Sequence, residues 1–511
     1  MNIFCNTFSV ASLFFRLGAV MVHILKLTKV HQPIELAYDG EGLRIDGDLN
    51  PRKKLKAERT CCCVPMPPPA QEDPTLLPIP NLNILNAFYN AKTNMVQIHA
   101  LIPREQDKED TPLDLYKFMY TVHDNKEDEA IEFCESMMAE VYKGLKREKS
   151  LKVLINPFGG QGRAKEIYNS YVFPIFESAK CKVDVQYTEF QGHAIKIAKD
   201  LDIEAFDAIV SVSGDGIPHE IINGYMQRPD ATEAMNKVPL GVIPGGTGNA
   251  LSVCLLGEKQ GFDPAYTALQ IIKGTNMALD LCSVSFSDHR YFSFLSQNYG
   301  ITAYADLGTE DLRWMGDSRT IVGLMKGIFG KHTYPVEIAL QIEESNKAKI
   351  KQDYENAYSA QTNILVDNTP GFKDTIPSLS ERVPDDWTII KEPVSFFLTS
   401  KMPWLARDML SHPFALPNDG LLDVLMVRGK NSITKQLGVF TKVENGKHVS
   451  SNLVEYYKVK AFRLTPLLDV NQKAYVAIDG EHAPVKPFQV QVHPGLATVL
   501  SIHTRYVYTS F

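Results

Sequence analysis

The fold is decided by three stretches in which an apolar segment ends in a glycine-rich turn: Lys152-Val-Leu-Ile155 before Asn156-Pro-Phe-Gly-Gly-Gln-Gly162, Ala208-Ile-Val-Ser-Val212 before Ser213-Gly-Asp-Gly216, and Leu240-Gly-Val-Ile243 before Pro244-Gly-Gly-Thr-Gly-Asn249. Each turn leads toward a helical pattern. Strands that alternate with helices form a parallel sheet, and such a sheet binds ligands beyond the carboxyl ends of its strands. We therefore expect all three turns at one ligand-binding edge.

Strand-like runs dominate after about Cys282, where helical connections become rare. These runs cover residues 291–295, 336–342, 394–398, 421–427 and 475–478. Strands without crossover helices favour antiparallel pairing. We therefore predict an α/β fold in which a parallel-sheet domain at 149–284 precedes a mostly antiparallel β-sandwich domain at 285–505. A polar insertion at about 343–386 interrupts the second domain, and we expect it to be a mobile loop.

The first 148 residues differ in composition from the rest. Residues 81–122 contain strand-like alternations, and residues 127–147 repeat apolar side chains at helical spacing, so we interpret 81–148 as a small regulatory N-terminal layer. Residues 1–80 contain a basic cluster, three consecutive cysteines and several prolines, which predicts a disordered or membrane-associating tail. The apolar stretch at 3–25 offers no clean window of about 18 apolar residues and predicts no spanning helix.

The composition limits the function. The 511 residues include 53 Lys+Arg and 60 Asp+Glu, for a formal net charge of -7. This acidic excess argues against nucleic-acid binding, which requires a basic surface to neutralise phosphates. The 8 cysteines are too sparse for a disulfide framework, so we expect a reducing compartment.

The glycine turns suit phosphate binding. Backbone N–H groups approach a phosphate closely where side chains are absent, and a following helix N-terminus adds positive partial charge. The first turn alone could equally be a strand-to-helix turn that needs positive φ. It matches neither GxxxxGK[ST] nor GxGxxG, which argues against ordinary P-loop ATPases and dehydrogenases.

Asp215 lies between two glycines at the end of a strand. Asp-Gly is a common hairpin turn, but the segment 218–224 has a helical pattern rather than that of a returning strand. At the ligand edge of the sheet, the Asp215 carboxylate could accept the proton of an attacking hydroxyl, as the base of phosphoryl transfer does.

Other motifs carry less weight. Asp479-Gly-Glu481 by itself predicts a hairpin turn between strands. Asp306 and Arg313 are seven residues apart and would share one face of a helix. Without further context, a surface ion pair is a simpler interpretation of these two residues than a functional site. We interpret His193 and His219 as structural, because no second ligand lies at metal spacing. No residue is assigned as a metal ligand.

The motifs together resemble a known family. The segments 156–160, 213–220, 245–251 and 479–481 occur in one order, as in the sphingosine kinases and more specifically the fungal sphingoid long-chain-base kinases of the diacylglycerol-kinase-like superfamily. The resemblance covers 151–501. It implies ATP-dependent phosphorylation of the primary hydroxyl of sphingosine, dihydrosphingosine or phytosphingosine to the 1-phosphate. It also implies Mg²⁺, a catalytic nucleotide-binding domain at 149–284, a lipid-binding β-sandwich domain at 285–505 and an active site in the cleft between the two domains.

The resemblance implies roles for individual residues. Asp215 stands at the position of the general base, Ser213, Gly214 and Gly216 surround it on the substrate side, and Asp306 matches the acidic residue that holds the substrate's polar head. The positions that contact the nucleotide are Asn156, Pro157, Phe158, Thr188, Glu189, Phe190, Gln191, Gly192, Glu220, Gly246, Thr247, Gly248, Arg313, Arg319, Asp479, Gly480 and Glu481.

The implied substrate brings membrane contact, because its hydrocarbon tail stays in a bilayer. A basic patch at 52–59 precedes Cys61, Cys62 and Cys63, and this combination suits acylation; a solvated charge run with unmodified cysteines is the alternative. We expect a cytoplasmic protein that associates peripherally with intracellular or plasma membranes.

Alternative functions share parts of the pattern. A diacylglycerol or ceramide kinase would use the same fold and the same Asp215, and NAD kinases share the Gly-Asp-Gly turn. The segment 219–223 and Asp306 favour the long-chain-base type. An inactive lipid-binding scaffold is a further alternative, against which the intact Asp215, Asp479 and Glu481 argue. Pro218 and the insertion at 343–386 depart from the family pattern.

Overall fold

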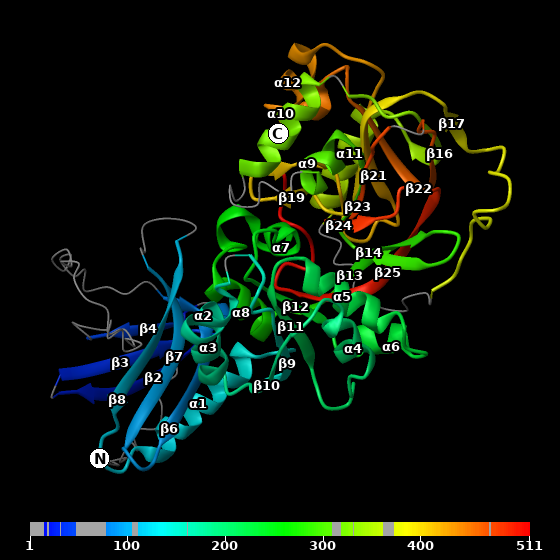
Figure 1. Cartoon of the computed structure of the whole chain (residues 1–511). Coiled ribbons are helices and arrows are strands. Elements are labelled where there is room, and N and C mark those ends of the chain that lie inside the picture. The colour runs from blue at the N-terminus through cyan, green and yellow to red at the C-terminus, as the bar shows by residue number, and fades with distance from the viewer. Residues whose placement is uncertain are drawn as a thin grey trace, which may run out of the picture. The chain divides into compact units, whose positions relative to one another are not determined.

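The computed structural model describes residues 15–17, 20–30, 32–47, 78–104, 111–160, 162–308, 318–330, 332–360, 372–469 and 472–510. The chain divides into two compact units (Figure 1). The first contains Met1–Lys149 with Asn169–Lys182, and the second contains Ser150–Tyr168 with Val183–Phe511.

The first unit is built on an eight-stranded antiparallel sheet with the order β5-β4-β3-β2-β8-β7-β6, and β1 pairs with β2. One face of helix α1 is buried, and this face includes Phe133 and Met137. The elements of this unit are β1 (Phe15–Leu17), β2 (Val20–Lys29), β3 (Gln32–Tyr38), β4 (Gly42–Asp46), β5 (Ile79–Pro80), β6 (Ile84–Asn90), β7 (Met95–Pro103), β8 (Leu113–Thr121), α1 (Glu127–Val141) and α3 (Phe173–Ser178).

Two expectations for this region need correction. The tail predicted at 1–80 is wrong for residues 20–46, because Leu25, Leu27, Ile34 and Leu36 alternate with more exposed residues and are buried in β2 and β3. The cysteine triplet lies outside the described residues. The helix predicted at 127–147 ends at Val141. The regulatory role of this unit stays a prediction.

The second unit begins with the predicted parallel sheet. Strand β11 pairs in parallel with β9 on one side and with β12 on the other, and β10 flanks β9. All residues of β11 are buried, as expected of a central parallel strand. The elements are β9 (Ser150–Ile155), α2 (Ala164–Ile167), β10 (Lys182–Tyr187), α4 (His193–Lys199), β11 (Ala208–Ser213), α5 (Gly216–Tyr225), α6 (Ala231–Lys237), β12 (Leu240–Pro244), α7 (Ala250–Gln260) and α8 (Pro264–Lys273).

The antiparallel part continues the same sheet. Its last strand, β25, pairs in parallel with β12 at Leu240↔Val499 and antiparallel with β13 and β22. The predicted fold class is therefore confirmed, and β25 joins its two parts. The elements are β13 (Thr275–Ser285), β14 (Arg290–Ser293), β15 (Ser296–Gly300), α9 (Ile301–Leu307), α10 (Ser318–Phe329), β16 (Val336–Glu344), α11 (Lys347–Ser359), β17 (Thr388–Ile390), β18 (Val394–Ser400), β19 (Trp404–Ala406), β20 (Met409–Leu410), β21 (Leu422–Arg428), α12 (Ile433–Phe440), β22 (Glu455–Pro466), β23 (Val476–Ile478), β24 (Glu481–Ala483) and β25 (Phe488–Ser501).

The insertion at 343–386 is not the mobile loop that the sequence predicts, as far as its residues are described. Helix α11 lies within it, begins at the side-chain cap of Asn346 and buries Ile350 and Tyr354. Farther along, the Arg463 guanidinium donates to the carbonyls of Ser378 (2.9 Å) and Glu381 (2.7 Å). A cap, buried side chains and a buried cation hold this segment.

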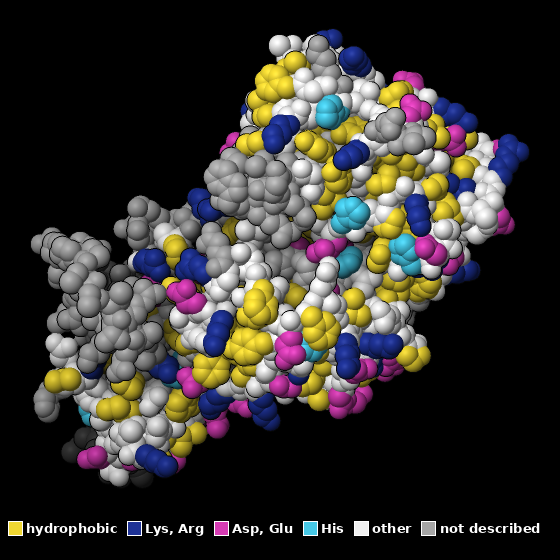
Figure 2. All heavy atoms as spheres, in the orientation of Figure 1, with side chains coloured by type: hydrophobic (Ala, Val, Ile, Leu, Met, Phe, Trp, Pro, Cys, Tyr) yellow, Lys and Arg dark blue, Asp and Glu magenta, His cyan; other side chains and the backbone are white. Residues whose placement is uncertain are grey.

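The surface of the protein is mixed in charge. On the face drawn in Figure 2, acidic and basic side chains are interspersed among apolar ones. Among the described residues, no helix is both long and apolar enough to cross a bilayer.

Candidate active site

The three glycine turns meet at the carboxyl ends of β9, β11 and β12. A Cβ atom placed on Gly160 would lie 2.9 Å from the Cα of Gly246, and one placed on Gly246 would lie 2.5 Å from the Cα of Gly214. Neither distance leaves room for a side chain, so these turns can pack against one another only as glycines. The predicted meeting of the turns is confirmed, and we call this region (156–162, 213–216 and 245–249) the glycine edge.

The outer turns of the glycine edge are braced by asparagines. The Asn156 side-chain oxygen accepts hydrogen bonds from the amides of Phe158 (3.0 Å) and Gly159 (3.1 Å). Asn249 donates through its side-chain amide to the Gly246 carbonyl at 2.8 Å. Phe158 is 77% exposed beside the first turn. The bracing by Asn249 was missed from the sequence, because an Asn directly before an apolar helix indicates a helix cap, whereas this side chain makes no capping hydrogen bond to α7 and bonds to Gly246 instead.

Asp215 lies at the N-terminus of α7. Its Oδ2 accepts a hydrogen bond from the Ala250 amide at 2.8 Å, and its Oδ1 accepts one from the Leu251 amide at 3.3 Å. Burial raises the pKa of Asp215 to about 6, although these two hydrogen bonds lower it. The Asp479 carboxylate adds to the increase. A carboxylate has about four lone-pair sites, so Asp215 can still accept a proton near neutral pH.

The segment 188–192 lies beside the first glycine turn. The Thr188 amide donates to the carbonyl of Ile155, the last residue of β9, at 2.9 Å. Glu220 of α5 accepts hydrogen bonds from the amides of Gly192 (2.8 Å) and Ala194 (3.0 Å), and thereby caps α4. The side chain of Glu220 thus orients this segment, and its predicted contact with the nucleotide stays a prediction. The Phe190 ring stacks on His193 with centroids 4.6 Å apart.

The turn at 479–481 joins the antiparallel strands β23 and β24, as its hairpin pattern predicts. The Gln191 amide nitrogen lies 3.4 Å from Glu481 Oε2, and a Cβ placed on Gly216 would lie 3.7 Å from Glu481 Oε1. The Asp479 side chain is 0% exposed and holds the turn from inside. Residues almost 300 positions apart in the sequence therefore gather around Asp215.

Comparisons with known proteins identify the family. Residues 150–284 match the diacylglycerol kinase catalytic domain, and residues 401–501 match the YegS C-terminal NAD kinase beta sandwich-like domain. The chain is 38% identical to sphingoid long chain base kinase 4 of Schizosaccharomyces pombe, over 72% of this chain and 79% of that protein. It is 32% identical to sphingoid long chain base kinase 5 of Saccharomyces cerevisiae (82% and 69%) and 30% identical to sphingosine kinase 1 of Homo sapiens (70% and 92%).

This chain belongs to the sphingoid long-chain-base kinase family. The resemblance found in its motifs is confirmed. In this family member, Asp215 lies within the glycine edge, two residues after Ser213. The Ser213 hydroxyl donates to the Gly214 carbonyl at 2.7 Å, which closes the turn.

Three predicted contacts of this kinase family member cannot be placed. Asp306 belongs to α9 and Arg319 to α10, but their side chains lie outside the described residues, as does the whole of Arg313. Their roles toward the substrate head group and the ATP phosphates stay predictions.

His219 makes a contact that the sequence did not indicate. Its Nδ1 lies 2.8 Å from Asp479 Oδ2. Burial lowers the pKa of His219, but the hydrogen bond to Asp479 and the nearby carboxylates of Glu481 and Glu220 outweigh this effect and raise it above its ordinary value. The interpretation of His219 as structural is therefore incomplete, because its ring contacts the buried Asp479 carboxylate.

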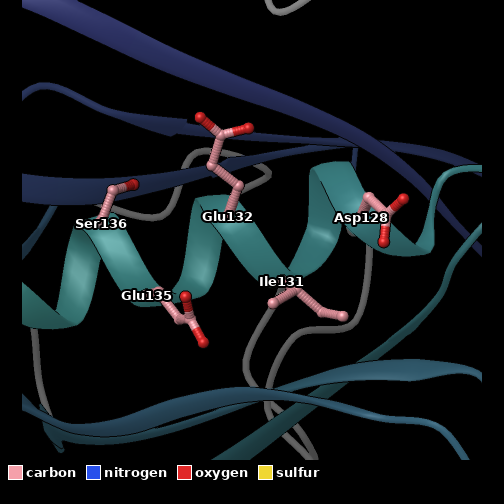
Figure 3. Close-up of a pocket in the computed structure, with 5 residues that line it drawn as sticks. All are labelled: Asp128, Ile131, Glu132, Glu135 and Ser136. Carbon is pink, nitrogen blue, oxygen red and sulfur yellow. The ribbon is translucent and has the colours of Figure 1, made fainter.

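A hollow of about 350 Å³ lies on α1 of the first unit (Figure 3). It is lined by Asp128, Ile131, Glu132, Glu135 and Ser136, all from one helix. It contains none of the predicted site residues, and we assign it no function.

Proposed function

We propose that the chain transfers the γ-phosphoryl group of ATP to the primary hydroxyl of a sphingoid long-chain base and releases the base 1-phosphate. The observation that carries this proposal is the position of Asp215, whose carboxylate lies where three glycine turns meet and whose pKa burial raises to about 6. The names of the curated relatives, sphingoid long chain base kinase and sphingosine kinase, supply the substrate class.

The chemistry needs a base and an aligned hydroxyl more than covalent help from the protein. The hydroxyl of the lipid donates a hydrogen bond to Asp215, and Asp215 takes its proton as the oxygen attacks the γ-phosphorus. The bond between the γ-phosphorus and the bridging oxygen breaks, and ADP leaves with the electron pair. The amides of Ala250 and Leu251 hold the Asp215 carboxylate in place throughout this step.

The nucleotide is held by the glycine edge and the segment 188–192. Glycine amides approach the phosphates, and Glu481 approaches from the turn at 479–481. Mg²⁺ takes carboxylate and phosphate oxygens and keeps several waters, so it needs no cage made of protein alone. Within the described ranges, no group of three His, Cys, Asp or Glu side chains forms such a cage. The Glu481 carboxylate fits the ion's preference for oxygen, and a bound ion would neutralise phosphate charge.

The finer assignments belong to the same proposal. Asp306 pairs with the protonated amine of the base, which would favour an amino alcohol over a neutral glyceride. Arg313 and Arg319 reach the ATP phosphates. The protein associates peripherally with intracellular or plasma membranes from the cytoplasm, with acylation of Cys61, Cys62 and Cys63 as one anchor.

The test is a transfer assay with radiolabelled ATP across a panel of acceptors. The panel contains sphingosine, dihydrosphingosine, phytosphingosine, a diacylglycerol, a ceramide and NAD. We expect label in the 1-phosphates of the three bases and little in the other acceptors. Label that appears in the diacylglycerol, the ceramide or NAD, and not in the bases, would replace this function by one of the alternatives.

A further inference from the structure

The Asp479 carboxylate is held by five donors. The Ser293 hydroxyl (2.5 Å) and the amides of Phe294 (3.2 Å), Leu295 (3.1 Å) and Ser296 (2.9 Å) all donate to it. These four donors are consecutive residues, from the last residue of β14 through the short connection to the first residue of β15. This connection explains why the strand predicted at 291–295 ends at Ser293. The fifth partner, the His219 ring, lies 2.8 Å away and comes from α5.

His219 also lies on the helix that follows the proposed catalytic base. Its backbone amide donates to the Asp215 carbonyl at 3.1 Å, within the first turn of α5. A carboxylate can only accept, so Nδ1 of His219 carries the hydrogen that points to Asp479. The ring is 12% exposed. One residue thus connects the Asp215 turn to the Asp479 turn.

Asn223 fixes the other side of the same junction. Its side-chain oxygen accepts from the Phe292 amide at 2.8 Å, and its side-chain nitrogen donates to the Phe292 carbonyl at 2.8 Å. Helix α5 is therefore tied to β14 one turn beyond His219. The backbone around the junction is held firmly, and the His219 ring reaches Asp479 from a fixed position.

The turn that His219 supports has the backbone of a two-residue hairpin turn. Asp479 has φ 51° and Gly480 has φ 82°. Positive φ at both positions is what Asp-Gly hairpin turns favour, and the contacts of the Asp479 side chain fix where this turn lies. The same turn carries Glu481 to Gly216 and Gln191. Loss of the contact from α5 would leave Glu481 free to move away from the glycine edge.

We propose that His219 is a positioning residue that fixes the 479–481 turn against the glycine edge and thereby sets the affinity for ATP. This inference rests on the proposed function, because that function supplies ATP as the ligand. Within it, His219 contacts neither the nucleotide nor the lipid. Its hydrogen bond to Asp479 fixes the 479–481 turn, and this turn fixes the position of Glu481.

The experiment compares two substitutions of nearly equal size in the full chain. His219→Asn can still donate a hydrogen bond toward Asp479, whereas His219→Leu cannot. A matched control is His412→Leu, because His412 is also buried and its ring contacts the Leu398 carbonyl in the sandwich. Binding of a fluorescent ATP analogue is measured without lipid, alongside KM for ATP, kcat and the melting temperature.

We expect His219→Leu to weaken binding of the analogue and raise KM for ATP about tenfold, the typical effect of losing one buried hydrogen bond to a charged group. kcat should fall less, His219→Asn should stay within about threefold of wild type, and His412→Leu should lower stability without changing ATP affinity. Equal ATP affinity in the Leu variant and wild type, or equal losses in the Leu and Asn variants, would overturn the inference.

A second variant covers the case in which His219→Leu does not fold. Ser293→Ala removes a different donor to the same Asp479 carboxylate with little change in volume. It should weaken binding of the analogue about threefold to tenfold, and unchanged binding would overturn the inference. Because the analogue is measured without lipid, a wild type that binds it but phosphorylates no sphingoid base would sink the proposed function alone.

Discussion

The glycine edge and the antiparallel part of the second unit both bury aspartates, but they surround them with different partners. In the antiparallel part, Asp280, Asp419 and Asp423 surround two lysines, and we call these five residues the ion cluster. Lys401 lies 2.9 Å from Asp280 and 2.8 Å from Asp419, and Lys458 lies 2.8 Å from both Asp419 and Asp423. Burial raises the pKa of all three aspartates. At Asp419, which contacts both lysines, the lysines outweigh burial and lower the pKa to about 2, whereas the pKa values of Asp280 and Asp423 stay raised.

Asp215 instead receives two backbone amides, and burial raises its pKa to about 6. Two lysines beside Asp215, like those beside Asp419, would hold its carboxylate ionised and prevent it from taking a proton near neutral pH. The partners of Asp215 therefore suit the proton transfer that we propose, and those of Asp419 suit a stabilising ion cluster.

The strongest test of this contrast is Asp215→Asn. The substitution removes the proposed base but leaves the glycine turns. We expect kcat to fall at least about 100-fold, because a general base typically accelerates a reaction by at least that factor. Binding of a fluorescent ATP analogue should stay within a few-fold. Wild-type turnover in this variant would remove Asp215 from its role.

A substitution in the ion cluster should lower the stability of the protein and leave ATP binding unchanged. Lys401→Met leaves Asp280 and Asp419 without one cation, and we expect the free energy of unfolding to fall by about 3–5 kcal/mol, as when one partner of a buried pair is removed. Denaturant unfolding measures this change. The folded fraction should bind ATP like wild type. A stability loss under about 1 kcal/mol would show that the cluster behaves like a surface ion pair.

A smaller effect should follow at the brace of the glycine edge. Asn249→Ala removes the hydrogen bond to the Gly246 carbonyl. The third turn then loses about 1 kcal/mol of support, so KM for ATP should rise a few-fold while kcat changes less. Steady-state kinetics at saturating lipid measure both. An unchanged KM would show that the turn keeps its shape through glycine packing alone.

The smallest effect is expected in the insertion, far in sequence from the glycine turns. Asn346→Ala removes the cap of α11, where the side chain accepts from the amides of Ala348 and Lys349. The expected loss is about 1 kcal/mol of stability, measured by thermal unfolding, with unchanged transfer activity. A loss of activity in this folded variant would give the insertion a part in catalysis.

The sequence predicted the glycine edge well because the information is local. Each apolar run with its terminal glycines specifies a parallel strand and its turn, and parallel strands share one ligand edge. Asp215 could be found for the same reason. The hairpin at 479–481 was also readable from Asp-Gly between strands.

What escaped prediction depends on contacts between distant residues. The pairing of β25 with β12 and the bond between His219 and Asp479 leave no periodic pattern. The strands β2 and β3 were hidden by their position before a polar, proline-rich stretch, which led us to extend the tail over them. In the insertion, the polar composition concealed the buried Ile350 and Tyr354 that anchor α11.

The most direct test of Asp215 as the base is the pH dependence of kcat/KM for the sphingoid base. Because the carboxylate must be ionised to take a proton, its raised pKa predicts a rate that falls tenfold per pH unit below about 6 and levels off above it. Stability should change with pH in the opposite direction to the rate. The folded protein binds the Asp215 proton more tightly than the unfolded chain does, so the free energy of unfolding falls as the pH rises from about 4 to about 6. A profile that stays flat from pH 5 to pH 8 would contradict the assignment.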